Sequence, residues 1–155
     1  TRVTKVEERF HSRLNAKEKV YQYRVVTGVH KNVFERKYQC PLHENLDVDA
    51  MKKAAGYLEG THDFKSFCSN KKMKKSSVRT IFRIEIEDAG QEVKFTFTGN
   101  GFLYNMVRIL TGTLIEVGRG DRRPEEMPCI LEGCDRSLAG FTAPARGLTL
   151  LEVRY

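Results

Sequence analysis

The sequence predicts an α+β fold, in which a split β-α-β-β-α-β order of elements builds an antiparallel sheet with helices packed on one face. Two observations carry this prediction. Apolar and polar residues alternate over 19–26, 82–87 and 93–98, as they do in half-buried strands. Apolar residues recur at helical spacing over 47–58 and 103–117, which favours two amphipathic helices.

The first half of the chain is expected to give a strand, a helix and a hairpin. Along 19–26, the alternation sets Tyr21, Tyr23 and Val25 on one side of a strand. Asp47 is the expected N-cap of the first helix, which ends near Gly60. The two following strands are expected to be joined by a turn at residues 89 and 90, an Ala-Gly pair.

The second half is expected to give a central helix, a short helix and a closing strand. Residues 103–117 are apolar around most of the helix, which is typical of a buried element. Pro124 suits the first position of a shorter helix that reaches about Leu131. Residues 148–155 are the expected last strand. No linker or repeat interrupts the pattern, so we expect one domain, 1–155.

Positive charge is concentrated in two places. The chain has 27 Lys and Arg against 20 Asp and Glu, and no acidic residue occurs between 64 and 84. Two separate basic clusters favour an extended anion such as nucleic acid, although a solvated loop without a partner would look the same. The candidate RNA-binding residues are Lys71, Lys72, Lys74, Lys75 and Arg79 in the first cluster and Arg119, Arg122 and Arg123 in the second.

Cysteine usage and hydropathy indicate the cytoplasm. The four cysteines show no CxxC spacing and the four histidines are scattered, so we expect neither a metal site nor a disulfide framework. No segment resembles a signal peptide, and no apolar run approaches the roughly 20 residues of a membrane helix.

One arginine stands inside the most apolar stretch of the chain. Arg108 lies in the run Gly99 to Gly112, where a buried and unpaired guanidinium would be costly. Either its side chain reaches solvent, or it meets a carboxylate at a functional site. No acidic residue is nearby in sequence.

Five motifs in order resemble the tRNA pseudouridine synthase A (TruA-type) family. They are spread over almost the whole chain, which makes the signal specific. They are Phe-His-Ser-Arg-Leu-Asn-Ala-Lys at 10–17, Tyr-Gln-Tyr at 21–23, Asp-Phe-Lys-Ser-Phe at 63–67, Asn-Gly-Phe-Leu-Tyr-Asn-Met-Val-Arg at 100–108, and Ala-Pro-Ala-Arg-Gly-Leu-Thr-Leu at 143–150.

The resemblance implies an isomerase that works without a cofactor. Members of the family convert uridine to pseudouridine at positions 38 to 40 of the tRNA anticodon stem-loop, and the complete enzyme is typically a homodimer. By motif, Arg108 would pair with a nucleophilic aspartate and Tyr21 would pack against the target base. Leu148 would line the base pocket. From the residues alone, Tyr21 also fits the role of an ordinary strand aromatic, and Leu148 fits that of a core leucine.

The family's nucleophile motif, Gly-Arg-Thr-Asp-Ala-Gly-Val-His, has no match among the 155 residues. Asp63 belongs to a different motif and is not a candidate nucleophile. We therefore expect the chain to be the C-terminal domain of such an enzyme, inactive without its N-terminal half.

Two alternatives remain open. The order of elements is also that of an RRM, so the first alternative is a stand-alone RNA-binding module without catalysis. The segment 93–99 lacks the glycine–aromatic pattern of the main RRM motif. The second alternative is a structural or dimerisation domain that has lost its chemistry.

Overall fold

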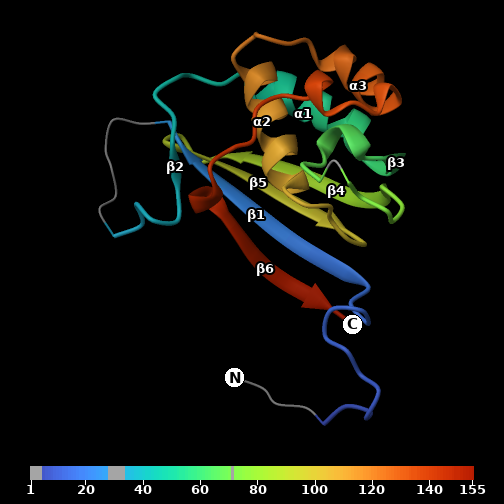
Figure 1. Cartoon of the computed structure of the whole chain (residues 1–155). Coiled ribbons are helices and arrows are strands. Elements are labelled where there is room, and N and C mark those ends of the chain that lie inside the picture. The colour runs from blue at the N-terminus through green and yellow to red at the C-terminus, as the bar shows by residue number, and fades with distance from the viewer. Residues whose placement is uncertain (1–4, 28–33, 71) are drawn as a thin grey trace.

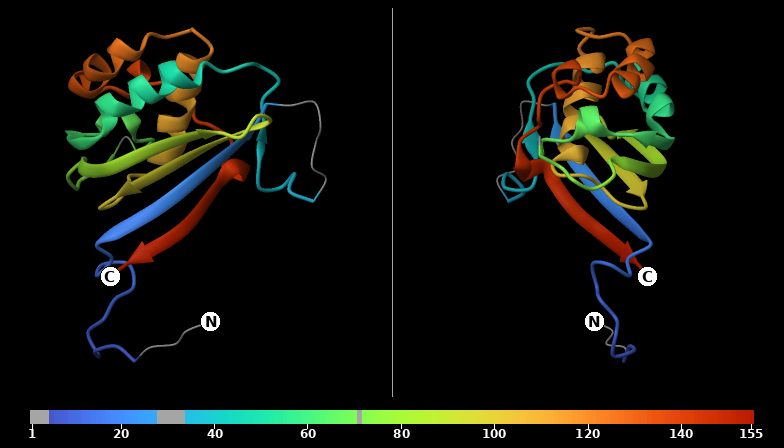
Figure 2. Two further views of the ribbon diagram at one scale, coloured as in Figure 1. Left: turned by 180° about the vertical axis from the view of Figure 1, so that it is seen from behind. Right: turned by 45° about the vertical axis from the view of Figure 1, so that its right-hand side comes forward.

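The computed structural model describes residues 5–27, 34–70 and 72–155 of the chain. Within this part, six strands form one sheet, and three α-helices lie over one of its faces (Figures 1 and 2). The strands are β1 (Glu18–Val26), β2 (Cys40–Pro41), β3 (Gly60–Asp63), β4 (Val78–Asp88), β5 (Glu92–Gly99) and β6 (Leu148–Arg154). The helices are α1 (Val48–Leu58), α2 (Met106–Gly118) and α3 (Met127–Gly133). The predicted α+β class is confirmed.

The sheet has the strand order β2-β1-β5-β4-β3, and β6 pairs with β1. One edge of β1 pairs antiparallel with β5. Its other edge is shared between two strands: β6 pairs antiparallel along residues 18–23, and β2 pairs parallel at Val25 and Val26. The sheet is thus antiparallel except for the β1–β2 pair, which the sequence pattern does not predict.

The predicted hairpin is present as β4 and β5. Ile84 lies opposite Phe97 and Ile86 lies opposite Phe95, so the apolar residues of both strands share one face. Gly90 has a φ of 82°, a left-handed conformation that glycine adopts at no steric cost, and its N–H donates to Asp88 Oδ1 at 2.8 Å. β4 begins four residues before the predicted strand, at Val78, and these extra residues pair with β3.

The first helix follows its prediction, and the other two begin later than predicted. Asp47 Oδ1 accepts a hydrogen bond from the N–H of Ala50 at 2.9 Å, which confirms the N-cap of α1. α2 begins at Met106 rather than 103, because Asn105 has a φ of 61° and cannot be part of a right-handed helix. Residues Pro124–Glu126 form a 3-10 turn, and α3 begins after it.

The core lies between the helices and the sheet. Tyr23, Phe95 and Phe97 point from the central strands and are fully buried, as are Leu110 and Leu114 of α2. Aromatic side chains of this size supply much of the stabilisation of a core, because each buries a large apolar area. α2 packs against β1, and Met106 and Val107 of its first turn are buried in the same core.

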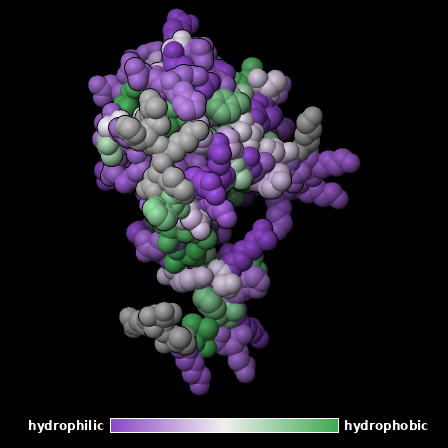
Figure 3. Space-filling model, turned by 90° about the vertical axis from the view of Figure 1, so that its left-hand side faces the viewer, coloured by the Kyte–Doolittle hydropathy of each residue, from purple (hydrophilic) through white to green (hydrophobic). Residues whose placement is uncertain are grey.

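The opposite face of the sheet is polar. The Arg24 guanidinium pairs with Glu92 at 2.5 Å and with Glu35 at 2.6 Å, which fastens the segment before β2 to the sheet. On β6, Leu150 and Leu151 are about half exposed, at 48% and 52%, and Leu150 lies opposite Tyr21, on the face that carries the core. Figure 3 shows hydrophilic side chains over most of the upper part of one side and hydrophobic ones gathered lower down.

Candidate active site

Arg108 lies in the first turn of α2 and is half-buried. Its Nε donates to the backbone oxygen of Ala143 at 2.6 Å, and its Nη1 donates to Asn105 Oδ1 at 3.0 Å. Both acceptors are neutral, and within the described ranges no carboxylate lies at ion-pair distance from Arg108. A guanidinium has five N–H donors, so three remain for another acceptor. Among the described residues, the positive charge of Arg108 is thus held in place without a counter-charge.

The segment that carries Ala143 is fastened along α2. The N–H of Gly140 donates to Thr113 Oγ1 at 2.9 Å, and the N–H of Phe141 donates to Glu116 Oε1 at 3.0 Å. The N–H of Ala143 donates to the backbone oxygen of Arg108 at 3.1 Å. A Cβ on Gly112 would fall 1.9 Å from the Phe141 oxygen, so only glycine permits this approach. The Ala143 oxygen is therefore fixed relative to Arg108.

Tyr23 holds the next residues of the same segment. Its hydroxyl donates to the backbone oxygen of Pro144 at 2.6 Å, and a Cβ on Gly147 would lie 2.6 Å from its Cζ. Burial raises the pKa of Tyr23 far above its ordinary value of 10, and the neighbouring Cys40 raises it further, while the charges of Arg108 and Arg146 lower it. The hydroxyl stays protonated and can donate to Pro144.

Tyr21 lies two residues before Tyr23, on the same face of β1. It is half-buried, and its ring meets that of Phe102 edge-on, with centroids 5.2 Å apart and an interplanar angle of 85°. Leu148, also half-buried, lies opposite Tyr23 on β6, and Leu150 lies opposite Tyr21. The charge of Arg108 acts on Tyr23, and Leu148 pairs with Tyr23, so Arg108, Tyr21 and Leu148 lie around this buried tyrosine.

The first basic cluster lies beside this region. Arg79 Nη1 donates to the backbone oxygens of Ser76 and Val78, and the Arg79 side chain runs 3.7 Å from a Cβ built on Gly101. Lys72, Lys74 and Lys75 are exposed, and in the part that the structure describes no acidic side chain forms an ion pair with them. Lys71, predicted with this cluster, lies outside the described residues.

The second cluster lies past the other end of α2 and is paired. Arg119 pairs with Glu44 and lies over the Phe141 ring, 5.7 Å from its centroid. Glu116 accepts from Arg122 at 3.1 Å, and Glu126 accepts from Arg122 at 3.4 Å and lies 3.8 Å from Arg123. At 1.5 Å per helical residue, Arg119 lies roughly 17 Å along α2 from Arg108. These charges are largely balanced within the chain.

In the described part, no buried side-chain nitrogen or oxygen lacks a hydrogen-bond partner. Asp63 Oδ1 accepts from the N–H of Lys65 at 2.9 Å, so it shapes the turn after β3. No three His, Cys, Asp or Glu side chains of the described ranges come together as metal ligands would. All four cysteines are free thiols. None of the described helices has the length and hydropathy to span a membrane.

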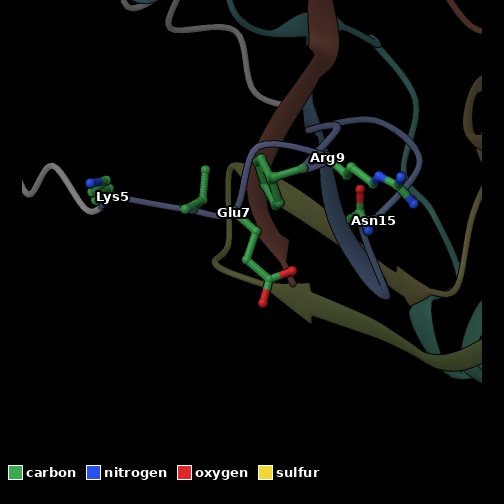
Figure 4. A pocket seen from close by; sticks show the side chains of 6 residues that line it. Lys5, Glu7, Arg9 and Asn15 are labelled. Carbon is green, nitrogen blue, oxygen red and sulfur yellow. The ribbon is translucent and has the colours of Figure 1, made fainter.

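A shallow hollow lies in the N-terminal segment, away from α2. Six residues line it: Lys5, Val6, Glu7, Arg9, Phe10 and Asn15 (Figure 4). The Phe10 ring contacts the ring of Tyr155, with centroids 4.9 Å apart, and Asn15 Oδ1 accepts from the N–H of His11 at 2.7 Å. The first family-like motif, 10–17, therefore forms a turn that caps the end of β6.

Two residues that organise this site have no role in the sequence-based prediction. Asn105 anchors Arg108 and Tyr23 anchors the Ala143 segment, yet both belong to the family-like motifs. The signal that points to them is their place beside Arg108 and Tyr21 in those motifs.

Comparison with known proteins bears on the family of this chain. The model of a family described as "tRNA pseudouridine synthase" matches residues 54–155. A tRNA pseudouridine synthase A of Brevibacillus brevis is 50% identical over 153 residues, covering 99% of this chain and 63% of that protein. The protein of the same name from Anoxybacillus flavithermus is 51% identical over 152 residues, covering 98% of this chain and 61% of that protein. The chain thus spans about three fifths of the length of these relatives, and it belongs to the tRNA pseudouridine synthase family.

Proposed function

We propose that this chain is the C-terminal domain of an enzyme that isomerises uridine to pseudouridine in the tRNA anticodon stem-loop, at positions 38 to 40. The family match and the relatives named tRNA pseudouridine synthase A support this function. The observation that carries it is the guanidinium of Arg108, which is held by two neutral acceptors and has no carboxylate partner in the described part of the chain.

In this proposal the nucleophilic aspartate that pairs with Arg108 comes from polypeptide outside the 155 residues. An arginine beside a carboxylate keeps it ionised and orients it through two parallel hydrogen bonds. Because Nη2 and one N–H of Nη1 are uncommitted, the guanidinium can form such a pair without releasing Ala143 or Asn105. A nucleophile must be deprotonated, so this pairing serves the chemistry directly.

Tyr21 and Leu148 form the wall against which the target base rests. Breaking and remaking the glycosidic bond requires a uridine that has left its stack, and an aromatic ring stabilises an unstacked base by about 1 to 3 kcal/mol. The Tyr21 ring is oriented by its edge-on contact with Phe102 and is half-buried, so part of it stays accessible. Its hydroxyl can take part in hydrogen bonding or proton transfer.

The basic side chains beside the site bind the RNA backbone. Lys72, Lys74, Lys75 and Arg79 have no acidic partner in the described ranges, so their charge is free to attract phosphates. The charges of Arg119 and Arg122 are already balanced by glutamates, so they attract phosphates less strongly. The proposal also takes from the family resemblance a homodimeric enzyme that uses no cofactor, and from the free thiols a cytoplasmic location.

Comparison with known proteins favours the synthase over the RRM-like module, because the family match covers two thirds of the chain and nothing found supports an RRM. The two proposals differ in one measurable outcome. A binding module retains stem-loop RNA and leaves its uridines unchanged, whereas the synthase converts them.

The experiment is a pseudouridine assay with stem-loop RNA, using three preparations: the 155-residue chain, a full-length synthase that includes it, and the chain mixed with the missing half. We expect product from the full-length enzyme, some product from the mixture, and none from the chain alone. Turnover by the chain alone would refute the external nucleophile. A full-length enzyme that binds the RNA without converting it would support the binding module.

A further inference from the structure

Asn105 holds an unusual position at the start of α2. Its backbone is left-handed, with φ 61° and ψ 7°, a conformation in which asparagine is enriched several-fold among non-glycine residues. It stands at the N-cap position, yet its side chain caps no backbone N–H of the helix. The amide is used elsewhere, so helix capping does not explain why this residue is an asparagine.

The side-chain amide of Asn105 joins two groups from different segments. Its Oδ1 accepts from Arg108 Nη1 at 3.0 Å, and its Nδ2 donates to Ser69 Oγ at 3.2 Å. A guanidinium can only donate, so the oxygen must face Arg108 and the NH₂ group must face Ser69. Both ends of the amide are satisfied in one orientation, which fixes the side chain that holds Arg108.

Ser69 is itself firmly placed. Its N–H donates to the backbone oxygen of Tyr104 at 3.1 Å. The short 3-10 helix before it, Lys65–Phe67, is anchored by Ser66, whose hydroxyl is buried and donates to the backbone oxygen of Ile130 at 2.6 Å. Ser69 also directly precedes the loop that carries the unpaired lysines. The Asn105 amide therefore links Arg108 to an anchored segment rather than to a free loop.

We propose that Asn105 is a positioning residue for catalysis: with Ser69 it fixes the guanidinium of Arg108 so that its free N–H groups face the carboxylate of the nucleophile. This rests on the proposed function, because it names the residue that orients Arg108 in the same site. The Ala143 oxygen fixes Nε alone, and a single hydrogen bond leaves the guanidinium free to swing about it. The second bond, from Nη1 to Asn105, removes that freedom.

Three substitutions separate positioning from folding. Asn105→Gly keeps the left-handed backbone and removes the amide. Asn105→Asp keeps the acceptor but turns it into a carboxylate that pairs with Arg108 and competes with the nucleophile. Ser69→Ala removes only the hydroxyl that orients the amide. Cys134→Gly is the matched control, because Cys134 is the other non-glycine residue of the described part with a positive φ, at 48°.

The first readout is steady-state turnover of stem-loop RNA by the full-length enzyme. Misplacing a catalytic group by about 1 Å costs up to roughly 100-fold in rate, so we expect Asn105→Gly and Asn105→Asp to lower kcat about 10- to 100-fold. KM should change by less than about threefold, because RNA binding is untouched. Ser69→Ala should lower kcat in the same way but less, and Cys134→Gly should leave it unchanged. Equal kcat in Asn105→Gly and wild type would overturn the proposal, as would a loss explained by the unfolded fraction.

The second readout needs no activity. In the 155-residue chain, hydrogen exchange of the Arg108 Nε–H, followed by NMR, reports how firmly the guanidinium is held. We expect faster exchange in Asn105→Gly and in Ser69→Ala than in wild type, with denaturation midpoints that show both variants to be folded. Unchanged exchange would overturn the positioning role, whether or not the full-length enzyme is active. If the wild-type enzyme is inactive but exchange is faster in the variants, only the proposed function is contradicted.

Discussion

Replacing Lys72, Lys74 and Lys75 together by Gln should weaken the salt dependence of RNA binding. The three side chains are exposed and have no acidic partner in the described ranges, so each can displace a counterion from a phosphate. Removing one lysine–phosphate pair lowers the slope of log K against log salt by about 0.7 to 0.9, so the slope should fall by about 2 to 3 in the triple variant.

The matched control removes three charges from the second cluster. Arg119, Arg122 and Arg123 are engaged with Glu44, Glu116 and Glu126. An arginine already paired in the protein releases few counterions on binding. The triple Arg→Gln variant should therefore change the slope by less than about 1.

The assay is fluorescence anisotropy of a labelled anticodon stem-loop RNA, titrated with the full-length enzyme at KCl concentrations between about 50 and 200 mM. Far-UV circular dichroism of each variant checks that it is folded. Equal slope changes in the two triple variants would refute the reasoning from ion pairing. A larger change in the arginine variant would place the RNA at the far end of α2.

Three further predictions concern folding of the 155-residue chain. Gly112→Ala should lower the free energy of unfolding in urea by about 3 kcal/mol or more, because its Cβ would fall 1.9 Å from the Phe141 oxygen; a loss under about 1 kcal/mol would contradict that close approach. Tyr23→Phe should cost about 1 to 3 kcal/mol, since the Pro144 oxygen loses its donor. The fold raises the pKa of Tyr23, so the stability that this residue contributes is retained below pH 10 and falls above it, as the unfolded chain loses the proton. Tyr23→Phe should reduce this loss of stability at alkaline pH. Identical pH profiles of the variant and the wild type would contradict the prediction. Asp47→Ala should cost about 1 kcal/mol in thermal unfolding through loss of the cap on α1, and an unchanged melting temperature would contradict it.

Local patterns predicted the elements whose formation depends on near neighbours. The hairpin follows from period-two alternation with a glycine at the turn, and α1 follows from Asp47 and the helical spacing after it. In both cases the decisive contacts join residues close in sequence. The central position of α2 was also predictable, because a helix that is apolar around most of its surface has to be buried.

The elements that were missed depend on contacts between distant segments. β2 has two residues, and it exists because β1 offers a partner and the Arg24–Glu35 pair fastens the segment before it. β3 forms by antiparallel pairing with the first residues of β4. Neither leaves a periodic pattern in so few residues. The late start of α2 depends on the left-handed backbone of Asn105, which the apolar periodicity does not report.

The candidate site was predictable in its side chains and not in its backbone partners. An arginine in an apolar run already indicates a special environment, and the motifs point to Tyr21 and Leu148. The partners that hold Arg108 are a backbone oxygen, that of Ala143, and an amide from a left-handed residue. Any residue has a backbone oxygen, so its role as an acceptor appears only once the fold is known.

The central claim is that Arg108 serves a carboxylate from outside the 155 residues. It is tested most directly by the Arg108→Met variant, measured for pseudouridine formation in the full-length enzyme and for unfolding in the 155-residue chain. Removing a preorganised charge that stabilises the reacting group should cost at least about 100-fold in kcat. Loss of two hydrogen bonds to neutral acceptors, offset by relief of an unpaired charge, should cost only about 1 to 3 kcal/mol of unfolding free energy. Turnover within about tenfold of wild type would contradict the claim.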